Sequence, residues 1–374
     1  MEMMLLEECC EILDSMRIPI TASNRKEGIY PYYGANGIQD HVADYIFDDE
    51  LVLLAEDGGN FGSKTRPIAY RVSGKCWVNN HAHVLKPKEG LNVDFLCYSL
   101  MFYNTEGLVN GATRQKLTQT TMRKMLIPNL SIENQLYIVN QLNKLLKIIE
   151  LRKKEIQQLD NLTKARFVEM FGDPVANDKG WKTKPLLDMG KCKNGMNFHY
   201  DDSGVEISCL GVGDFKDLSV IDNTKKLSIV SLNEMPSEEY LLKDGDIVFV
   251  RSNGNKDLVG RSLAIYPGNL PTTFSGFCIR YRIHDDEITV PYLLRVLKME
   301  SMRKKMAGRG ANIQNLNQQI LGTLVIPVPP IELQNQFVDF VRAIDKSKFD
   351  TMTFAPIYAI INLYLHTYFY QGRR

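Results

Sequence analysis

Residues 131–171 read SIENQLYIVNQLNKLLKIIELRKKEIQQLDNLTKARFVEMF, and this stretch contains no proline or glycine. As one continuous helix it would be about 60 Å long, which is too long for the core of one small domain. Leu142, Ile149 and Ile156 recur at heptad spacing, and the positions around them are rich in Lys, Glu, Gln and Asn. This pattern predicts a long helix whose apolar face needs a partner helix.

Composition indicates an ordinary globular chain. The 374 residues suffice for two or three domains, and the net charge of +1 means that any nucleic-acid surface must be local. The seven cysteines form no CxxC pair, which favours reduced thiols in a cytosolic protein. Glu2, Glu7 and Glu8 replace the basic start of a signal peptide, and the longest apolar stretch, Ile357–Leu365, is too short to cross a bilayer. We therefore expect a soluble, cytoplasmic protein with no membrane segment.

The sequence after the long helix repeats the sequence before it. Matching segments follow the same order, and their offset drifts only from 195 to 199 residues. The matching pairs are Leu51–Ala55 with Asp246–Val250, Val78–Val84 with Phe274–Arg280, Phe95–Phe102 with Tyr292–Met299, Gly111–Leu117 with Gly310–Leu316, Ile127-Pro128 with Ile326-Pro327, and Glu133 and Gln135 with Glu332 and Gln334. This order indicates an internal duplication.

The predicted fold is therefore α+β, with two pseudo-repeated, β-rich globular domains that are each followed by a long helix. The two helices are expected to pack antiparallel as a coiled coil. Pro329-Pro330 favours a helix start, whereas Pro356 would break the second helix. The predicted segments are the first globular domain at 1–130, the first long helix at 131–171, the second globular domain at 172–329, the start of the second helix at 330–349, and a divergent tail at 350–374.

The apolar faces of these helices are the predicted interface between the helices and with partner subunits. The residues assigned to it are Ile138, Leu142, Leu145, Ile149, Ile156, Leu159, Phe337, Val341 and Ile344. We expect that replacing Leu142, Ile149 and Ile156 together with Asp prevents assembly and leaves each globular domain folded.

Motifs for catalysis are missing from the sequence. It contains no GxxxxGK[ST] phosphate loop, no HExxH, no GxSxG and no [DNS]PP[YFW] tetrapeptide of amino-methyltransferases. His81 and His83 would share a face of a strand, but no carboxylate or cysteine lies near them in sequence. Asp57, beside Gly58-Gly59, is interpreted as a turn residue rather than a lone nuclease carboxylate. We expect no catalytic residue and no metal site.

Polar loops occupy corresponding places in both repeats. Arg suits bidentate contact with guanine, Asn and Gln suit adenine, and Lys and Arg also bind phosphates. The candidate DNA-binding residues of the first domain are Asn36, Gln39, Asn60, Lys64, Arg66, Asn79, Asn80, Arg114, Gln115 and Lys116. Those of the second domain are Arg251, Ser252, Asn253, Asn255, Lys256, Arg261, Arg309, Asn312, Gln314 and Asn315.

Two similar domains held apart by long helices would suit a DNA target with two separate halves. A spacer of about 60 Å is close to two turns of B-DNA. Such a protein would recognise two short half-sites with an unread gap between them. Because the loops of the repeats have diverged, the half-sites should differ.

The order of the segments GANG, DGGNFGS, VNNHAHVLKP, IPNLSIENQ, FVEMFGDP and IPVPPIELQNQF resembles the specificity subunit of a Type I restriction–modification system, over roughly residues 5–348. The resemblance implies that each globular domain is a target recognition domain for one half of a bipartite double-stranded DNA sequence, in a chain that is not itself catalytic. It implies that the helices recruit two copies of the modification (adenine-methyltransferase) subunit, and that a restriction subunit joins for cleavage. S-adenosylmethionine, ATP and Mg would be bound by those partners, and no cofactor by this chain. The partner would flip out the target adenine. The tail from Asp350 departs from the family pattern.

Three other hypotheses stay open at this point. The chain is alternatively a DNA-modifying enzyme, a nuclease or methyltransferase with unfamiliar motifs or a fragment of a fused polypeptide. It is alternatively an assembly module whose domains do not touch DNA. The unusual tail also suits a donor copy of recognition domains that is not itself assembled.

Overall fold

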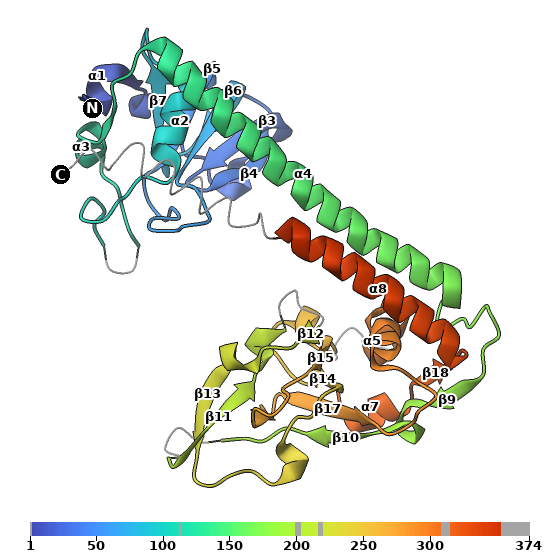
Figure 1. The fold of residues 1–374 in the computed structure, drawn as a ribbon. Coiled ribbons are helices and arrows are strands. Elements are labelled where there is room, and N and C mark those ends of the chain that lie inside the picture. The colour runs from blue at the N-terminus through green and yellow to red at the C-terminus, as the bar shows by residue number, and fades with distance from the viewer. Residues whose placement is uncertain (1, 112–113, 199–202, 216–219, 308–314, 353–374) are drawn as a thin grey trace. The chain divides into compact units, whose positions relative to one another are not determined.

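The long helix predicted from the sequence is α4 (Ile132–Phe171) in the computed structural model, which describes residues 2–111, 114–198, 203–215, 220–307 and 315–352 (Figure 1). The chain divides into two compact units, and their boundary falls inside α4 between Ile156 and Gln157. The first unit thus contains the first globular domain, α4 as far as Ile156, and the end of α8 from Phe349. The second unit is Gln157–Lys348.

The first unit is built on a six-stranded sheet. Its strands, in spatial order, are β2 (Cys10–Ile12), β7 (Ala82–Pro87), β5 (Phe47–Ala55), β6 (Ala69–Val78), β3 (Glu27–Gly34) and β4 (Gly37–Val42). All neighbours are antiparallel except β3 and β6. A tight turn at Asn36-Gly37 joins β3 to β4, and Gly37 has a φ of +110°, which favours glycine.

Helices and a two-stranded sheet complete the first unit. These elements are β1 (Met3–Leu5) paired with β8 (Leu126–Pro128), and α1 (Leu6–Cys9), α2 (Val93–Met101) and α3 (Gln119–Arg123). The apolar face of α4 joins this core, in which Ile138 and Leu142 are buried and Leu145 and Ile149 are partly buried.

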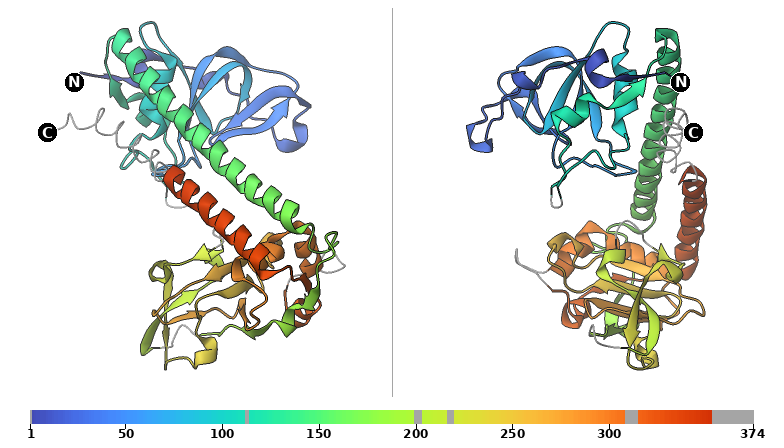
Figure 2. Two further views of the ribbon diagram at one scale, coloured as in Figure 1. Left: turned by 45° about the vertical axis from the view of Figure 1, so that its right-hand side comes forward. Right: turned by 90° about the vertical axis from the view of Figure 1, so that its left-hand side faces the viewer.

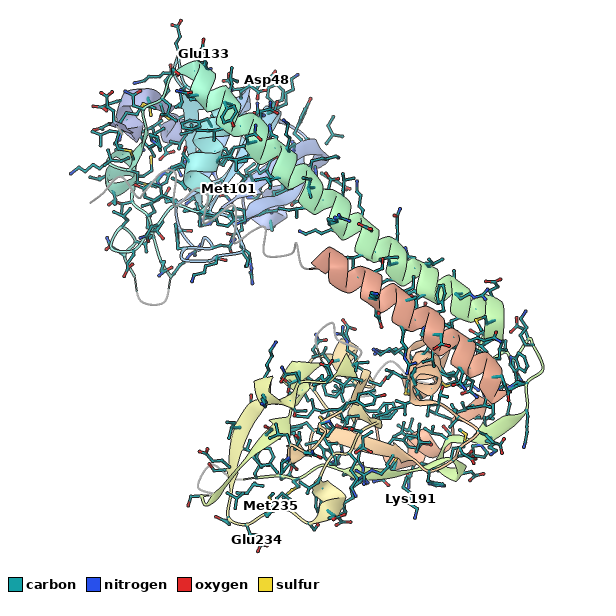
Figure 3. All side chains as sticks on the ribbon, in the orientation of Figure 1. Asp48, Met101, Glu133, Lys191, Glu234 and Met235 are labelled. Atoms are coloured by element: carbon teal, nitrogen blue, oxygen red, sulfur yellow. The ribbon has the colours of Figure 1, made fainter. Side chains whose placement is uncertain are left out.

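The second unit contains a five-stranded and a three-stranded sheet. The larger sheet has the order β10 (Gly190–Asn194), β17 (Cys278–Ile283), β14 (Asp246–Val250), β15 (Ser262–Ile265) and β12 (Val220–Ile221). The smaller has the order β13 (Ser228–Leu232), β11 (Val205–Leu210) and β16 (Thr272–Phe274). The remaining elements are β9 (Thr183–Pro185) paired with β18 (Val325–Pro327), and α5 (Val290–Lys298), α6 (Glu300–Ala307), α7 (Gln318–Gly322) and α8 (Ile331–Met352). Figure 3 shows how densely side chains fill the space between these strands and α5.

The same hydrogen bonds recur in the two units. Gln135, buried at the start of α4, accepts from the Asn92 N–H (2.8 Å) and donates to the carbonyls of Gly90 and Leu130. Gln334, buried at the start of α8, accepts from the Thr289 N–H (2.9 Å) and donates to the carbonyls of Glu287 and Pro329. The strand order β2-β7-β5-β6 in the first unit likewise corresponds to β10-β17-β14-β15 in the second. The duplication inferred from the sequence is therefore also present in the fold.

The predicted antiparallel pairing of the two helices is confirmed within the second unit. Asp160 of α4 forms an ion pair with Lys348 of α8 (2.6 Å). Further along α4, the rings of Phe167 and Phe171 contact Phe337, near the start of α8. Residue numbers therefore rise along one helix as they fall along the other, and α8 lies beside the C-terminal half of α4 in every view (Figures 1 and 2).

The second helix extends a little further than predicted, because α8 is helical through Met352. Pro356 and the rest of the predicted tail lie outside the described residues. The seven cysteines are free thiols, as predicted, and all are buried except the half-buried Cys192. No helix among the described residues has the length and apolar character needed to cross a membrane.

Candidate nucleic-acid interface

In the first unit the predicted polar loops meet through direct hydrogen bonds. Asn36 donates through Nδ2 to the Gly58 carbonyl (2.9 Å), so the β3–β4 turn contacts the segment after β5. Asn79 donates through Nδ2 to Oε1 of Gln39 (3.0 Å), so the β6–β7 turn contacts β4. The main chain of Gly58 donates to the Gln115 carbonyl (3.1 Å). Four loops that are far apart in sequence thus form one polar surface.

Asp57 lies at the centre of this surface. Its Oδ1 is 2.7 Å from Nδ1 of His81 and 2.7 Å from Nη2 of Arg114. The side chain of Asp57 is 18% exposed, whereas that of Arg114 is 60% exposed. A mostly buried carboxylate therefore holds an exposed guanidinium group.

Asp57 and His81 were not among the predicted DNA-binding residues. The interpretation of Asp57 as a turn residue missed its two side-chain partners, which come from distant segments. The expectation that His81 and His83 share a strand face was also wrong, because β7 begins at Ala82 and His81 belongs to the preceding turn. No local sequence signal links residues 57, 81 and 114.

The other predicted residues of the first domain have varied surroundings. Lys116 pairs with Glu56 (3.0 Å), and Asn60 donates to the Pro67 carbonyl (3.3 Å). Lys64, Arg66 and Asn80 are exposed.

A buried charged network lies behind this surface. Asp14, Glu56 and His83 are close enough together to resemble a metal site. Arg17, however, already supplies a positive charge, 2.6 Å from Glu56 and 3.5 Å from Asp14. Burial acts to raise the pKa of the Asp14 carboxyl, but hydrogen bonds from His83, the Val84 N–H and Gln119 outweigh it, so the pKa lies below its usual value.

This network also supports the loop that carries Arg114. His83 lies 2.9 Å from the Leu117 carbonyl, and the Leu117 N–H donates to the Glu56 carbonyl (2.7 Å). These contacts fix the end of the loop that carries Arg114. The group is therefore a hydrogen-bonded support rather than a set of ligands that await an ion.

In the second unit the corresponding segment follows β14. The Leu316 N–H donates to the Arg251 carbonyl (2.8 Å), and Ser252 forms a β-bridge with Asn315. Nη1 of Arg251 donates to the Gly276 carbonyl (3.3 Å). Asn253 and Asn255 accept main-chain N–H groups from residues two positions later, which shapes the loop. Arg309, Asn312, Gln314 and the side chain of Lys256 lie outside the described residues.

Positively charged side chains form a cluster behind this second loop. Nε of Arg261 and Nη2 of Arg303 both donate to the Asp257 carbonyl (3.3 Å each). Burial and the positive charges of Arg295, Arg261 and Arg303 lower the pKa of Lys298 to about 8. Only Arg261 of this basic cluster was a predicted DNA-binding residue, because the others lie on helices α5 and α6.

The two loop surfaces correspond residue by residue but differ in chemistry. The Glu56 N–H donates to the His81 carbonyl (2.9 Å), and the Arg251 N–H donates to the Phe277 carbonyl (2.8 Å). Phe277, which is 59% exposed, therefore stands where the first unit has His81. By the same correspondence, Ser252 stands where the first unit has Asp57.

The predicted helix interface needs one correction. Ile138 and Leu142 are buried within the first unit's own core, and Phe337 is buried within that of the second. Replacing Leu142 with Asp would therefore disrupt the first unit, contrary to our expectation that both domains stay folded. The remaining members are half-buried, namely Leu145, Ile149, Ile156, Leu159, Val341 and Ile344.

A different face of α4 carries exposed apolar side chains in the first unit. Tyr137, Ile148 and Leu151 are 60%, 44% and 51% exposed. Their spacings of eleven and three residues place them on one side of a helix. The heptad pattern did not single out this face.

A family model for the type I restriction modification DNA specificity domain matches residues 1–161 and again residues 178–357. A putative type I restriction enzyme specificity subunit from Haemophilus influenzae is 30% identical over 361 residues, which cover 93% of this chain and 87% of that protein. The specificity subunit of the StySPI type I restriction enzyme from Salmonella potsdam is 24% identical over 313 residues, covering 77% of this chain and 66% of that protein.

Solved structures show the same fold. The type I restriction–modification S subunit from M. genitalium superimposes with a TM-score of 0.53 at 15% identity, covering 98% of this chain and 94% of the other. A chain from a structural study of complex assembly in a type I restriction–modification system gives 0.56 at 16% identity, covering 98% and 95%.

Proposed function

The chain belongs to the family of DNA specificity subunits of type I restriction–modification systems, and from this premise we propose how its two units divide the work. Each unit recognises one half of a bipartite DNA sequence through its loop surface. The observation that supports this division is the occurrence of the two surfaces at corresponding positions of a duplicated fold, with different side chains. The surface built around Asp57 and His81 in one unit meets different bases from the surface with Ser252 and Phe277 in the other.

Catalysis, in this proposal, belongs to partner chains. Two modification subunits transfer the methyl group, and a restriction subunit joins them for cleavage. S-adenosylmethionine, ATP and Mg bind to those partners, in the cytoplasm. The support is chemical: Asp14, Glu56 and His83, which group together as metal ligands could, are largely buried, and Arg17 already pairs with both carboxylates.

We propose that the modification subunits dock on exposed apolar side chains of the long helices. Tyr137, Ile148 and Leu151 form such a surface on α4, facing away from the core residues Ile138 and Leu142. Large apolar side chains grouped on one helix face favour a protein contact.

Methyl transfer with purified components tests this assignment. The chain alone, given duplex DNA and labelled S-adenosylmethionine, should transfer no methyl groups. Addition of the modification subunit should start transfer to a bipartite sequence, and without this chain the modification subunit should lose sequence selectivity. Methyl transfer by the chain alone would contradict the proposal.

A further inference from the structure

We propose that the half-site of the first unit contains a guanine that Arg114 recognises, and that Asp57 positions Arg114 for this contact. The inference rests on the proposed function and adds which base and which side chains are involved.

The guanidinium group of Arg114 is both held and accessible. Among the described residues, it donates a hydrogen bond through Nη2 to Asp57 at 2.7 Å, and the same Nη2 lies 3.4 Å from Nδ1 of His81, whose own proton is directed at Asp57. A guanidinium group has five N–H donors in one plane. One edge is thus fixed by the protein, while the side chain as a whole remains 60% exposed.

Gly58 provides the surface over which the guanidinium lies. A Cβ added to Gly58 would lie 3.3 Å from Nε of Arg114 and 3.7 Å from Cζ, and Gly58 has a φ of +62°. Asn36 fixes this backbone from the other side through the Gly58 carbonyl. A flat group over a fixed peptide has less freedom to rotate than a solvated arginine.

The charge balance favours a base edge over a phosphate. Asp57 compensates the charge of Arg114 at 2.7 Å, and it would repel a phosphate placed against the same group. Guanine presents two uncharged acceptors, O6 and N7, which an oriented arginine contacts with two parallel hydrogen bonds. The held and neutralised Arg114 therefore suits guanine better than the DNA backbone.

The second unit lacks this arrangement. Ser252 and Phe277 occupy the positions of Asp57 and His81, so no carboxylate stands at the corresponding place. An exposed phenyl ring suits apolar contact, for instance with a thymine methyl group. Phe277 therefore gives an internal comparison, because its replacement should affect the other half-site.

The test uses the full chain assembled with its modification subunits and a library of duplexes with each base in turn at every position of both half-sites. Methylation rates give the preference at each position. The wild-type complex should require guanine at one position of one half-site. Arg114→Ala should reduce that preference roughly 10- to 100-fold and leave the other half-site unchanged.

Asp57→Asn should weaken the base preference at the same position. The double variant with Asp57→Asn and Arg114→Ala should weaken this preference no further than Arg114→Ala alone. Gly58→Ala should act in the same direction by displacing the guanidinium group. Phe277→Ala should alter only the opposite half-site. Arg123→Ala, which removes an exposed cation on α3 outside the loop surface, should keep the wild-type preferences.

Retention of the wild-type preferences by Arg114→Ala, or relaxation of a position other than the one that Asp57→Asn relaxes, would overturn the inference. Wild-type complex without any sequence-selective methylation would instead count against the proposed function itself.

Discussion

In the basic cluster of the second unit, Lys298 has a strongly lowered pKa. Burial and the charges of Arg295, Arg261 and Arg303 lower its pKa to about 8, while Asp257 is the acidic group near Arg303. A DNA phosphate placed there would stabilise the charged amine and raise the pKa again. Binding above pH 8 would therefore require proton uptake, whereas below pH 8 the proton is already present.

We therefore predict that the affinity of the assembled complex for target DNA is constant from pH 6.5 to 7.5 and falls as pH rises above about 8, by at most about tenfold per pH unit. Fluorescence anisotropy at fixed salt measures this. Lys298→Arg should remove the pH dependence and keep the affinity, because arginine stays charged. An unchanged pH profile in that variant would show that Lys298 does not contact the DNA.

For individual residues, sequence patterns could locate the polar loops but could not show which side chains contact one another there. Arg114 was found because its segment, Gly111–Leu117, recurs in the second repeat, and Asn36 and Gln39 were found as amide side chains of a predicted polar loop. The partnership of Asp57 with His81 and Arg114 depends on how distant segments fold together, which no local spacing encodes. Phe277 was missed because an isolated aromatic residue in sequence looks like part of a core.

At the scale of elements, each long helix is attached to its unit by one buried glutamine. Gln135 forms three hydrogen bonds with residues near α2, and Gln334 forms four near α5, the fourth accepted from the Thr289 hydroxyl. Replacement by alanine leaves a buried main-chain N–H and two carbonyls without these partners.

Gln135→Ala and Gln334→Ala should each lower the free energy of unfolding by about 2–4 kcal/mol. The loss should be confined to the unit that carries the substitution, which calorimetry and limited proteolysis of the full chain can resolve. A loss below about 0.5 kcal/mol in either variant would mean that the attachment depends on apolar packing alone.

The heptad pattern of α4 predicted a helix correctly, but the expectation that a partner helix covers its apolar face holds only in the second unit. In the first unit the globular domain itself covers Ile138 and Leu142. In the second unit α8 lies against α4, as Phe337 and Lys348 show. A repeat of apolar residues has the same appearance in both cases, so periodicity alone could not distinguish them.

This distinction changes the variants that test assembly. Ile148→Asp combined with Leu151→Asp should prevent binding of the modification subunit without lowering the melting temperature, because both side chains are exposed. Leu142→Asp should instead unfold the first unit, because its side chain is buried in the core.

Gln157→Asp is the matched control, since Gln157 is exposed and nine residues, two and a half turns, from Ile148, on the opposite side of α4. Size-exclusion chromatography of mixtures with the modification subunit measures binding. Normal complex formation by the Ile148 and Leu151 double variant would show that partners dock elsewhere.

At the scale of the whole molecule, the duplication was the feature that the sequence revealed best. Segments matched at offsets of 195 to 199 residues, and the structure places β5 with β14, β7 with β17, α2 with α5 and α3 with α7 in equivalent roles. The matching segments keep their order although the two repeats have diverged in sequence, because each repeat must form the same core. The loop residues face no such requirement, so they are free to differ between the repeats and to recognise different bases.

The central claim is that this chain gives a modification complex a DNA target with two unlike halves. Base-resolution methylation mapping of cells that carry the chain together with its modification subunit tests it directly. The account predicts one bipartite motif, with two different half-sites separated by a gap of fixed length, and loss of that motif when the chain is removed. A continuous motif, two identical half-sites, or methylation that persists without the chain would contradict it.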